Sequence, residues 1–161
     1  MVPGDLVAVD ALACAQYPDY PERPEVYADR LARAPDWCFV LERDGRLAGY
    51  LLAHPWHEAG PPPLDTVLDG LPPTPSALHL HDCVIAPPAR GLGLAAAVLD
   101  RLETEAQGRF RALTLVAIAG KRAFWERRGF VDATRPALRE TLESYDPSAA
   151  YLEKALPRRL G

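Results

Sequence analysis

The stretch APPARGLGLAA, residues 86–96, joins a segment typical of a strand to a segment typical of a helix. The strand segment is 78–86, where apolar and polar residues alternate, and the helical segment is 91–106. Gly91 and Gly93 allow the backbone to approach a ligand closely, because they carry no side chain. The helix begins at the same place, so its free N–H groups and the positive end of its dipole face the loop. This arrangement favours an anion and suits a pyrophosphate.

Two other interpretations of this loop have to be weighed. The pattern Gly91-x-Gly93-x-x-Ala96 also fits the dinucleotide-binding fingerprint, which requires an acidic residue at the end of the next strand. The next predicted strand, 113–117, reads LTLVA and has no acid. Residues 87–90 also separate the glycines from the preceding strand, whereas the dinucleotide turn follows its strand tightly. On this motif alone, a glycine turn with a purely structural role stays open.

Hydrophobic spacing and turn residues divide the rest of the chain into predicted elements. The clearest is a hairpin, whose two β-rich segments flank the tight-turn dipeptide Asp44-Gly45. The proline-rich stretch 55–75 is a loop, within which the apolar residues between Leu64 and Leu71 predict a short amphipathic helix. The full set is helices over 5–15, 24–34, 91–106 and 120–128, and strands over 37–42, 47–54, 78–86, 113–117, from 129–131 onward and over 150–155.

This order of elements predicts a mixed α/β (α+β) fold. The strand–helix–strand unit in the middle needs one crossover connection, while the hairpin and the last strands supply antiparallel neighbours. The 161 residues suffice for one hydrophobic core, so we expect a single domain over 1–161.

Composition narrows the class of function. The net charge of −4 offers no basic surface to nucleic acid, and no apolar stretch is long enough to span a membrane. Cys14, Cys38 and Cys83 are odd in number and form no CxxC pair, so we expect reduced thiols and no metal site. With an acid at Asp5 and no long apolar run, the N-terminus does not read as a signal peptide. We therefore expect a soluble, cytoplasmic protein that binds neither nucleic acid nor membranes, as a monomer or homodimer.

The strand before the glycine loop carries a histidine pair. A regular strand directs His79, His81 and Cys83 to one face, with the histidine Cα atoms roughly 7 Å apart. The other face then receives Leu78, Leu80, Asp82 and Val84. Taken alone, such histidines are often solvated, and no third ligand with suitable spacing supports a metal site. A histidine also titrates near neutral pH, so the pair is a candidate for proton transfer.

Three motifs, in order and spacing, resemble the GNAT family of N-acetyltransferases. Arg90-x-x-Gly93-x-Ala95 resembles the acetyl-CoA motif Q/R-x-x-G-x-G/A of that family. Residues 123–130 (AFWERRGF) resemble its A-x-F-Y-x-x-x-G-F element, and 151–154 (YLEK) its usual last strand. The resemblance implies the GNAT fold, a mixed, mostly antiparallel central sheet with helices on both faces, and acetyl-CoA as the co-substrate.

Two features depart from that pattern. The first strand of the family has almost no sequence to form it before Asp5, and Trp125 stands at the position of the family's tyrosine. That tyrosine commonly protonates the leaving CoA thiolate, whereas an indole N–H donates a hydrogen bond but is not a practical acid. Either the thiolate leaves unprotonated, or another group such as Tyr145 or Tyr50 serves, or activity is low. Trp125 can equally be explained as a core aromatic residue of the predicted helix 120–128, without a role in the site.

The resemblance also implies how the donor binds, without any metal. Backbone groups of the strand would pair with the pantetheine arm, backbone amides of the loop would hold the pyrophosphate, and Arg90 would add charge. The implied donor residues are Cys83, Val84, Ile85, Arg90, Gly91, Leu92, Gly93, Leu94, Ala95 and Ala96.

On the acceptor side, the histidines stand at the same offset from Arg90 as the His-x-His pair of the arylalkylamine (serotonin) N-acetyltransferases, a branch of that family. This resemblance implies His79 and His81 as catalytic residues that remove the proton of a small primary amine in a ternary complex. It implies an acceptor pocket that includes His54, Trp56, Phe124 and Trp125.

Two alternatives to a small-amine acetyltransferase stay open. An acetyltransferase acting on a protein lysine or N-terminus would need an open peptide groove, whereas the loop 55–75 is able to roof a small pocket. A non-catalytic acyl-CoA-binding module is favoured by Trp125, while His79 and His81 favour an enzyme.

Overall fold

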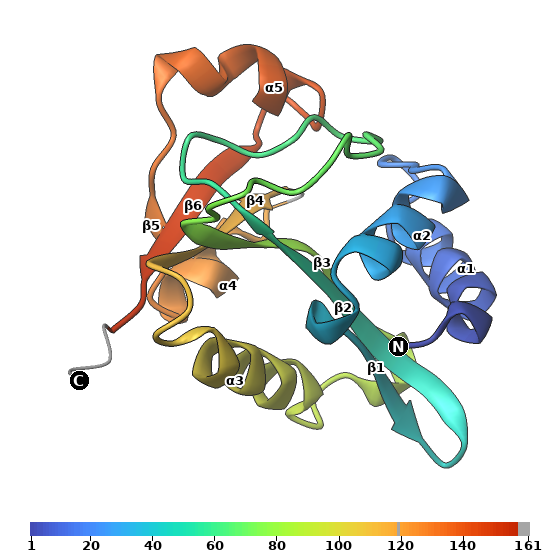
Figure 1. Cartoon of the computed structure of the whole chain (residues 1–161). Helices are drawn as coiled ribbons and strands as arrows, with labels where there is room; N and C mark the ends of the chain where they lie inside the picture. Colours follow the sequence, from blue (N-terminus) through green and yellow to red (C-terminus); the bar gives the residue numbers. More distant parts are fainter. Residues whose placement is uncertain (119, 158–161) are drawn as a thin grey trace.

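A six-stranded sheet in the order β1-β2-β3-β4-β6-β5 forms the centre of the computed structural model, which describes residues 1–118 and 120–157 (Figure 1). Only β3 and β4 run parallel, and the other neighbouring pairs are antiparallel. The strands are β1 (Cys38–Arg43), β2 (Arg46–Trp56), β3 (Ala77–Ile85), β4 (Ala112–Ala117), β5 (Val131–Asp132) and β6 (Ala150–Ala155). The predicted mixed, mostly antiparallel sheet is confirmed.

Helices cover both faces of this sheet, as predicted (Figure 1). On one face, α1 and α2 pack on β2 through Val9 and Leu31, which share a cluster with Tyr50. On the other face, α3 buries Leu99 and Leu102 in the main core. The helices are α1 (Leu6–Gln16), α2 (Pro24–Arg33), α3 (Leu94–Ala106), α4 (Arg122–Arg127) and α5 (Arg139–Glu143). None of the described helices is both long enough and apolar enough to cross a membrane.

The β1–β2 hairpin turns where the sequence predicts. Asp44 and Gly45 have φ angles of 51° and 70°, and Arg43 pairs with Arg46 on either side of them. Two consecutive left-handed residues match the right-handed twist of the flanking strands, which explains the choice of an Asp-Gly dipeptide.

Two predicted helical segments differ from the structure. The expected helix between Leu64 and Leu71 is wrong, because these residues form turns and irregular chain. Their carbonyl groups are used by α2 instead: Arg30 Nη2 donates to Thr66 O at 2.7 Å, and Arg33 donates to Leu68 O. The helix predicted over 91–106 begins later, at Leu94, because Gly93 adopts a left-handed φ of 78°. Neither difference moves the glycine loop.

The start of the chain enters the fold without a strand. Pro3–Asp5 form a 3₁₀ turn that leads directly into α1, and no strand precedes α1 in the described part of the chain. The sequence did not predict α5, a helix of five residues in which Leu142 packs against Tyr151 of β6.

A β-bulge in β3 changes the predicted strand phase. Leu52 pairs with Asp82 and Ala53 with Leu80, so His81 is an extra residue without a cross-strand partner on β2. Beyond the bulge the phase is inverted, and Cys83 packs with the core under α3. The expectation that Cys83 shares a face with His79 and His81 is therefore wrong.

The sheet splits between its two parallel strands. The β3–β4 pairing ends at Leu80 and Leu115, although β3 continues to Ile85 and β4 to Ala117. Past this point β3 stays paired with β2, and β4 stays paired with β6. The split opens a cleft, with the glycine loop beyond the end of β3.

Candidate active site

The larger of two adjoining cavities, here called the donor cleft, lies along the unpaired part of β3 and has a volume of about 320 Å³. Its lining comes from β3, the C-terminal end of α1, the glycine loop and α4. The lining residues are Gln16, Tyr17, Cys83, Val84, Ile85, Arg90, Ala95, Lys121, Phe124 and Trp125. Of the predicted donor residues, the structure thus brings Cys83 to Ile85, Arg90 and Ala95 together in one cleft.

The glycine loop leads from this cleft to α3. Gly91 and Gly93 have φ angles of 76° and 78°, and a Cβ atom built on either would meet no protein atom within 4 Å. Both glycines are exposed, and α3 starts at the residue after Gly93. The requirement for glycine here is therefore conformational and leaves open backbone at the mouth of the cleft.

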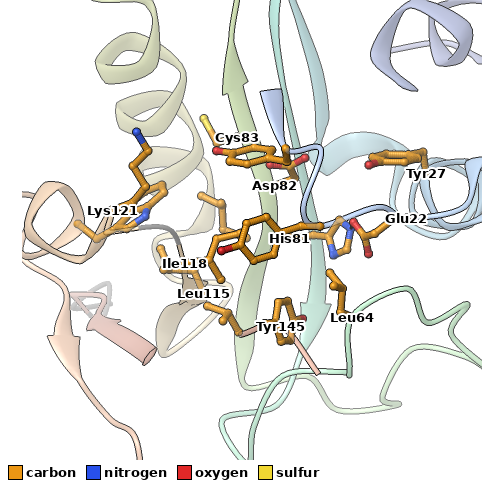
Figure 2. Close-up of a pocket in the computed structure, with 15 residues that line it drawn as sticks. Glu22, Tyr27, Leu64, His81, Asp82, Cys83, Leu115, Ile118, Lys121 and Tyr145 are labelled. Atoms are coloured by element: carbon orange, nitrogen blue, oxygen red, sulfur yellow. Dashed lines mark hydrogen bonds and ion pairs between the residues drawn. The ribbon is translucent and has the colours of Figure 1, made fainter. Parts of the chain in front are cut away.

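The smaller cavity, here called the acceptor cavity, has a volume of about 70 Å³ and lies between β3, β4, one residue each of α2 and α4, and four loops (Figure 2). Tyr17, Cys83, Lys121 and Trp125 line both cavities, so the two spaces meet at these side chains. The remaining lining residues are Tyr20, Glu22, Tyr27, Leu64, Leu80, His81, Asp82, Leu115, Val116, Ile118 and Tyr145.

A histidine–carboxylate pair stands in the acceptor cavity. His81 Nε2 lies 3.1 Å from Glu22 Oε2, and the two side chains are only 4% and 8% exposed. Burial by itself raises the pKa of Glu22, but the charge and hydrogen bond of His81 and the backbone N–H of Asp65 outweigh it. The pKa of Glu22 is therefore below its ordinary value, and the carboxylate stays charged beside the imidazole.

A second carboxylate lies next to the histidine in β3. The Tyr50 hydroxyl donates a hydrogen bond to Asp82 Oδ2, and burial raises the pKa of Asp82 to about 6. Tyr50 itself is fully buried, and neither cavity is lined by it. The acceptor cavity thus carries two acidic side chains around His81.

The other predicted histidines, His79 and His54, lie outside both cavities. His79 is 1% exposed, its Nδ1 lies 3.0 Å from Thr114 Oγ1, and burial lowers its pKa to about 3. The ring of His54 lies 5.4 Å from that of His79 and is also fully buried. Burial lowers the pKa of His54 strongly. Trp56 donates its Nε1–H to Gly60 O at 2.9 Å. None of these three side chains lines either cavity.

The two predicted aromatic residues of α4 do reach the donor cleft. Trp125 is 9% exposed, with the rings of Phe124 and Phe130 packed edge-on at 5.0 and 5.6 Å. Arg90 also lines the cleft, where its Nε donates to Ile85 O at 3.3 Å and its Nη2 donates to Gln16.

Sequence reasoning missed the residues that close the acceptor cavity. The segment between α1 and α2 meets the loop after α5 where Tyr20 donates its hydroxyl proton to Asp146 Oδ2 at 2.6 Å. Tyr145 donates to Pro62 O at 2.8 Å, which ties that loop to the proline-rich stretch. The one available signal was the segment QYPDYPERP, residues 16–24, where two tyrosines and an acid follow a broken helix. These three tied loops are called the roof below.

No group of three or more histidine, cysteine, aspartate or glutamate side chains suited to a metal ion occurs in residues 1–118 and 120–157. The split parallel pair and the glycine loop at the start of α3 form a cleft suited to the long, anionic donor of an acyl-CoA-dependent transferase. Residues 6–130 match the model of the acetyltransferase (GNAT) family, and the chain belongs to this family. The protein is thus an acetyltransferase that uses acetyl-CoA as co-substrate.

Solved structures with this fold differ in what they bind. N-acetylglutamate synthase from Neisseria gonorrhoeae, complexed with coenzyme A and N-acetyl-glutamate, superposes with a TM-score of 0.73 at 18% identity, over 98% of this chain and 34% of that one. The GNAT-like decarboxylase GphF with isobutyryl-CoA has a TM-score of 0.74 at 16% identity, over 98% and 97%. Arabidopsis thaliana Naa50 with the bisubstrate analogue CoA-Ac-MVNAL has a TM-score of 0.68 at 12% identity, over 95% and 93%. At these identities the likeness establishes the fold. A search of curated proteins gave no significant sequence match.

Proposed function

We propose that the protein acetylates a small primary amine by direct attack on acetyl-CoA in a ternary complex. The observation that carries this proposal is the small acceptor cavity, which holds the His81–Glu22 pair and shares four lining residues with the donor cleft. A thioester at the junction of the two cavities is within reach of an amine beside His81.

The donor occupies the split in the sheet. The edge of β3 at Cys83 and Val84 has no β4 partner, so backbone groups there can pair with the pantetheine arm, while Ile85 O already accepts from Arg90 Nε. The backbone amides from Gly91 to Ala96 hold the pyrophosphate at the start of α3. Arg90 supplies positive charge in the same cleft.

His81 is the better general base of the two histidines proposed for catalysis. An alkyl ammonium with a pKa of about 10.4 is almost wholly protonated at neutral pH and cannot attack a thioester. His81 lines the cavity and accepts this proton, while Glu22 stabilises the imidazolium that forms. His79 is buried outside the cavity and supports the strand through Thr114. The resemblance to the arylalkylamine branch rests on the offset of this histidine pair.

The charge of the acceptor cavity favours a cationic amine. Glu22 and Asp82 both line it, and an ammonium ion gains from two nearby carboxylates. A substrate carboxylate at the same position would be repelled, which argues against the decarboxylation chemistry named for GphF.

The roof favours a small acceptor over a peptide. Three loops distant in sequence are tied together by the Tyr20–Asp146 and Tyr145–Pro62 hydrogen bonds. A cavity of about 70 Å³ admits a short alkyl amine or the end of one side chain. Naa50 has the same fold and binds a peptide analogue, so a protein N-terminus is the alternative acceptor. The alternative without turnover is a non-catalytic acyl-CoA-binding module. A cytoplasmic location also stays a prediction, supported by the free thiols Cys14, Cys38 and Cys83.

The test is release of the CoA thiol from acetyl-CoA in the presence of short alkyl amines, polyamines, peptide N-termini and lysine peptides. We expect turnover with a short amine and little with any peptide. Faster turnover with peptides would establish the alternative acceptor class. Tight binding of acetyl-CoA without turnover on any amine would favour the non-catalytic module.

A further inference from the structure

The departing sulfur of CoA has no tyrosine on α4 to protonate it, because Trp125 occupies that position. A donor that lies along β3 and delivers its acetyl group to the acceptor cavity has its sulfur where the two cavities meet. Among residues 1–118 and 120–157, four side chains line both cavities: Tyr17, Cys83, Lys121 and Trp125. A group that assists the leaving thiolate is therefore to be sought among these four side chains.

Three of the four are poor acids. The Trp125 indole has an N–H donor but does not ionise in the working range. Burial, and to a smaller extent the charge of Asp82, raises the pKa of the Cys83 thiol to about 12. The same two causes raise the pKa of the Tyr17 hydroxyl to about 12. Each can donate a hydrogen bond, but none carries a positive charge.

Lys121 differs from the others in charge and in surroundings. Its ammonium group belongs to an exposed residue, and within residues 1–118 and 120–157 no carboxylate lies within ion-pair distance of it. Its backbone is fixed at the start of α4, where Lys121 O accepts from Phe124 N at 3.0 Å and Lys121 N donates to Ile118 O at 2.9 Å. The side chain therefore starts from a fixed backbone position at the junction, and no described carboxylate neutralises its charge.

The acceptor cavity consequently has opposite charges at its two ends. Figure 2 shows Lys121 on one side of the cavity and the pair His81–Glu22 on the other, with Asp82 between them. An amine is drawn to the carboxylate end, where its proton is removed. The sulfur of the donor lies toward the cationic end, where negative charge develops as the thioester breaks.

We propose that Lys121 stabilises and protonates the departing CoA thiolate, in place of the missing tyrosine. The amine nitrogen forms a bond to the acetyl carbon, the carbon–sulfur bond breaks, and its electron pair stays on sulfur. The sulfur takes a proton from the Lys121 ammonium group, which regains one from water. The substrate ammonium group loses two protons through His81, one before the attack and one as the tetrahedral intermediate collapses. One of the two balances the proton that Lys121 takes up from water, and the other is released to solvent. This inference rests on the donor placement under the proposed function.

The test is a pH titration of the thiol of coenzyme A bound to the protein, followed by the ultraviolet absorbance of the thiolate. A cation beside the sulfur favours the thiolate, so the bound thiol should ionise more readily than the free thiol. Lys121→Met should lower the acid dissociation constant of the bound thiol at least tenfold. Lys121→Arg, which keeps the charge, should leave it nearly unchanged. Calorimetric affinity for coenzyme A checks that both variants still bind it.

A kinetic measurement separates proton transfer from charge alone. At saturating acetyl-CoA, Lys121→Met should lower kcat at least tenfold, and Lys121→Arg should recover only part of it because guanidinium is not an acid in this range. A Met variant with an unchanged thiol titration would overturn the proposal, and so would a variant that raises only the KM for acetyl-CoA. The titration needs no acceptor. Lack of turnover with every amine would thus count against the proposed function, while the titration still decides the role of Lys121.

Discussion

His81 Nε2 lies 3.1 Å from Glu22 Oε2 although 59 positions separate them in the chain. The contact forms because the bulge in β3 gives His81 no partner on β2, and because the segment after α1 crosses above that point. The buried Glu22 carboxylate orients the His81 imidazole and offers a negative charge to the imidazolium that forms when the base takes up a proton.

Replacement of His81 tests the base directly. His81→Ala should lower kcat at neutral pH at least tenfold, since a general base contributes on the order of a hundredfold. Donor affinity should not change, and higher pH should restore part of the rate as free amine accumulates. Steady-state kinetics across pH, with Glu22→Gln as the partner variant, check this. Equal pH–rate profiles for parent and His81→Ala would falsify the assignment.

The glycine loop is tested by bulk and charge at one position. Gly93→Glu should abolish acetyl-CoA binding, because it brings a carboxylate to the expected pyrophosphate site. Any side chain at Gly93 is strained by the φ of 78°, at a cost of about 1–2 kcal/mol, so Gly93→Ala is the matched control. Calorimetry should find Gly93→Ala weaker than the parent but far tighter than Gly93→Glu. Equal affinities of the two variants for acetyl-CoA would mean that the donor site lies elsewhere.

The roof is tested by removing one hydroxyl group. Tyr20→Phe deletes the hydrogen bond to Asp146 and keeps the ring, so the loops part more easily. We expect the ratio of kcat/KM for a peptide amine to that for a short amine to rise about fivefold, the size of one net hydrogen bond. Tyr145→Phe, which frees Pro62 O, should act in the same direction. An unchanged ratio in both variants would mean that the roof does not select the acceptor.

Two buried histidines make stability depend on pH. Burial lowers the pKa of His79 to about 3 and that of His54 well below its ordinary value, so both bind protons only in the unfolded chain as the pH falls below about 6.5. Asp82 has the opposite effect, because its pKa of about 6 in the folded chain lets the folded state bind a proton that the unfolded state does not bind until lower pH. Between about pH 6 and pH 5 the unfolded chain therefore binds more protons than the folded chain, so lowering the pH should lower the free energy of unfolding.

Urea titrations at several pH values measure this slope. His79→Gln should flatten it, because one proton of the unfolded state is removed. A slope that stays the same in this variant would contradict the assignment of the effect to His79.

Trp125 is expected to serve packing more than chemistry. Trp125→Phe should change the rate less than about threefold if Lys121 assists the sulfur, whereas a loss of about tenfold would indicate an indole hydrogen bond to the thiolate. Trp125→Tyr should be at least as active as the parent, since it supplies a hydroxyl donor at the junction. A well-folded Tyr variant with normal donor affinity but a much lower rate would mean that position 125 does not face the sulfur.

The donor half of the site could be predicted from the sequence because one continuous stretch builds it. Strand, glycine loop and helix follow each other over 78–106, and each has its own local signal. The acceptor half could not be predicted, since Glu22, Lys121 and Tyr145 come from three loops that meet only in the folded chain. Periodicity was also unable to reveal the extra residue at His81, which turned Cys83 to the opposite face.

The bulge has a consequence for which changes the chain can accept in evolution. Residue 81 has no partner in the β2 register, so a substitution there leaves the register of the neighbouring residues intact. Deletion of the same residue would restore regular pairing and direct the side chains of one half of β3 to the opposite face of the sheet. The strand register therefore accepts a new side chain at position 81 but not a shorter strand, and a descendant of this chain that lost the base would inherit the architecture without this chemistry.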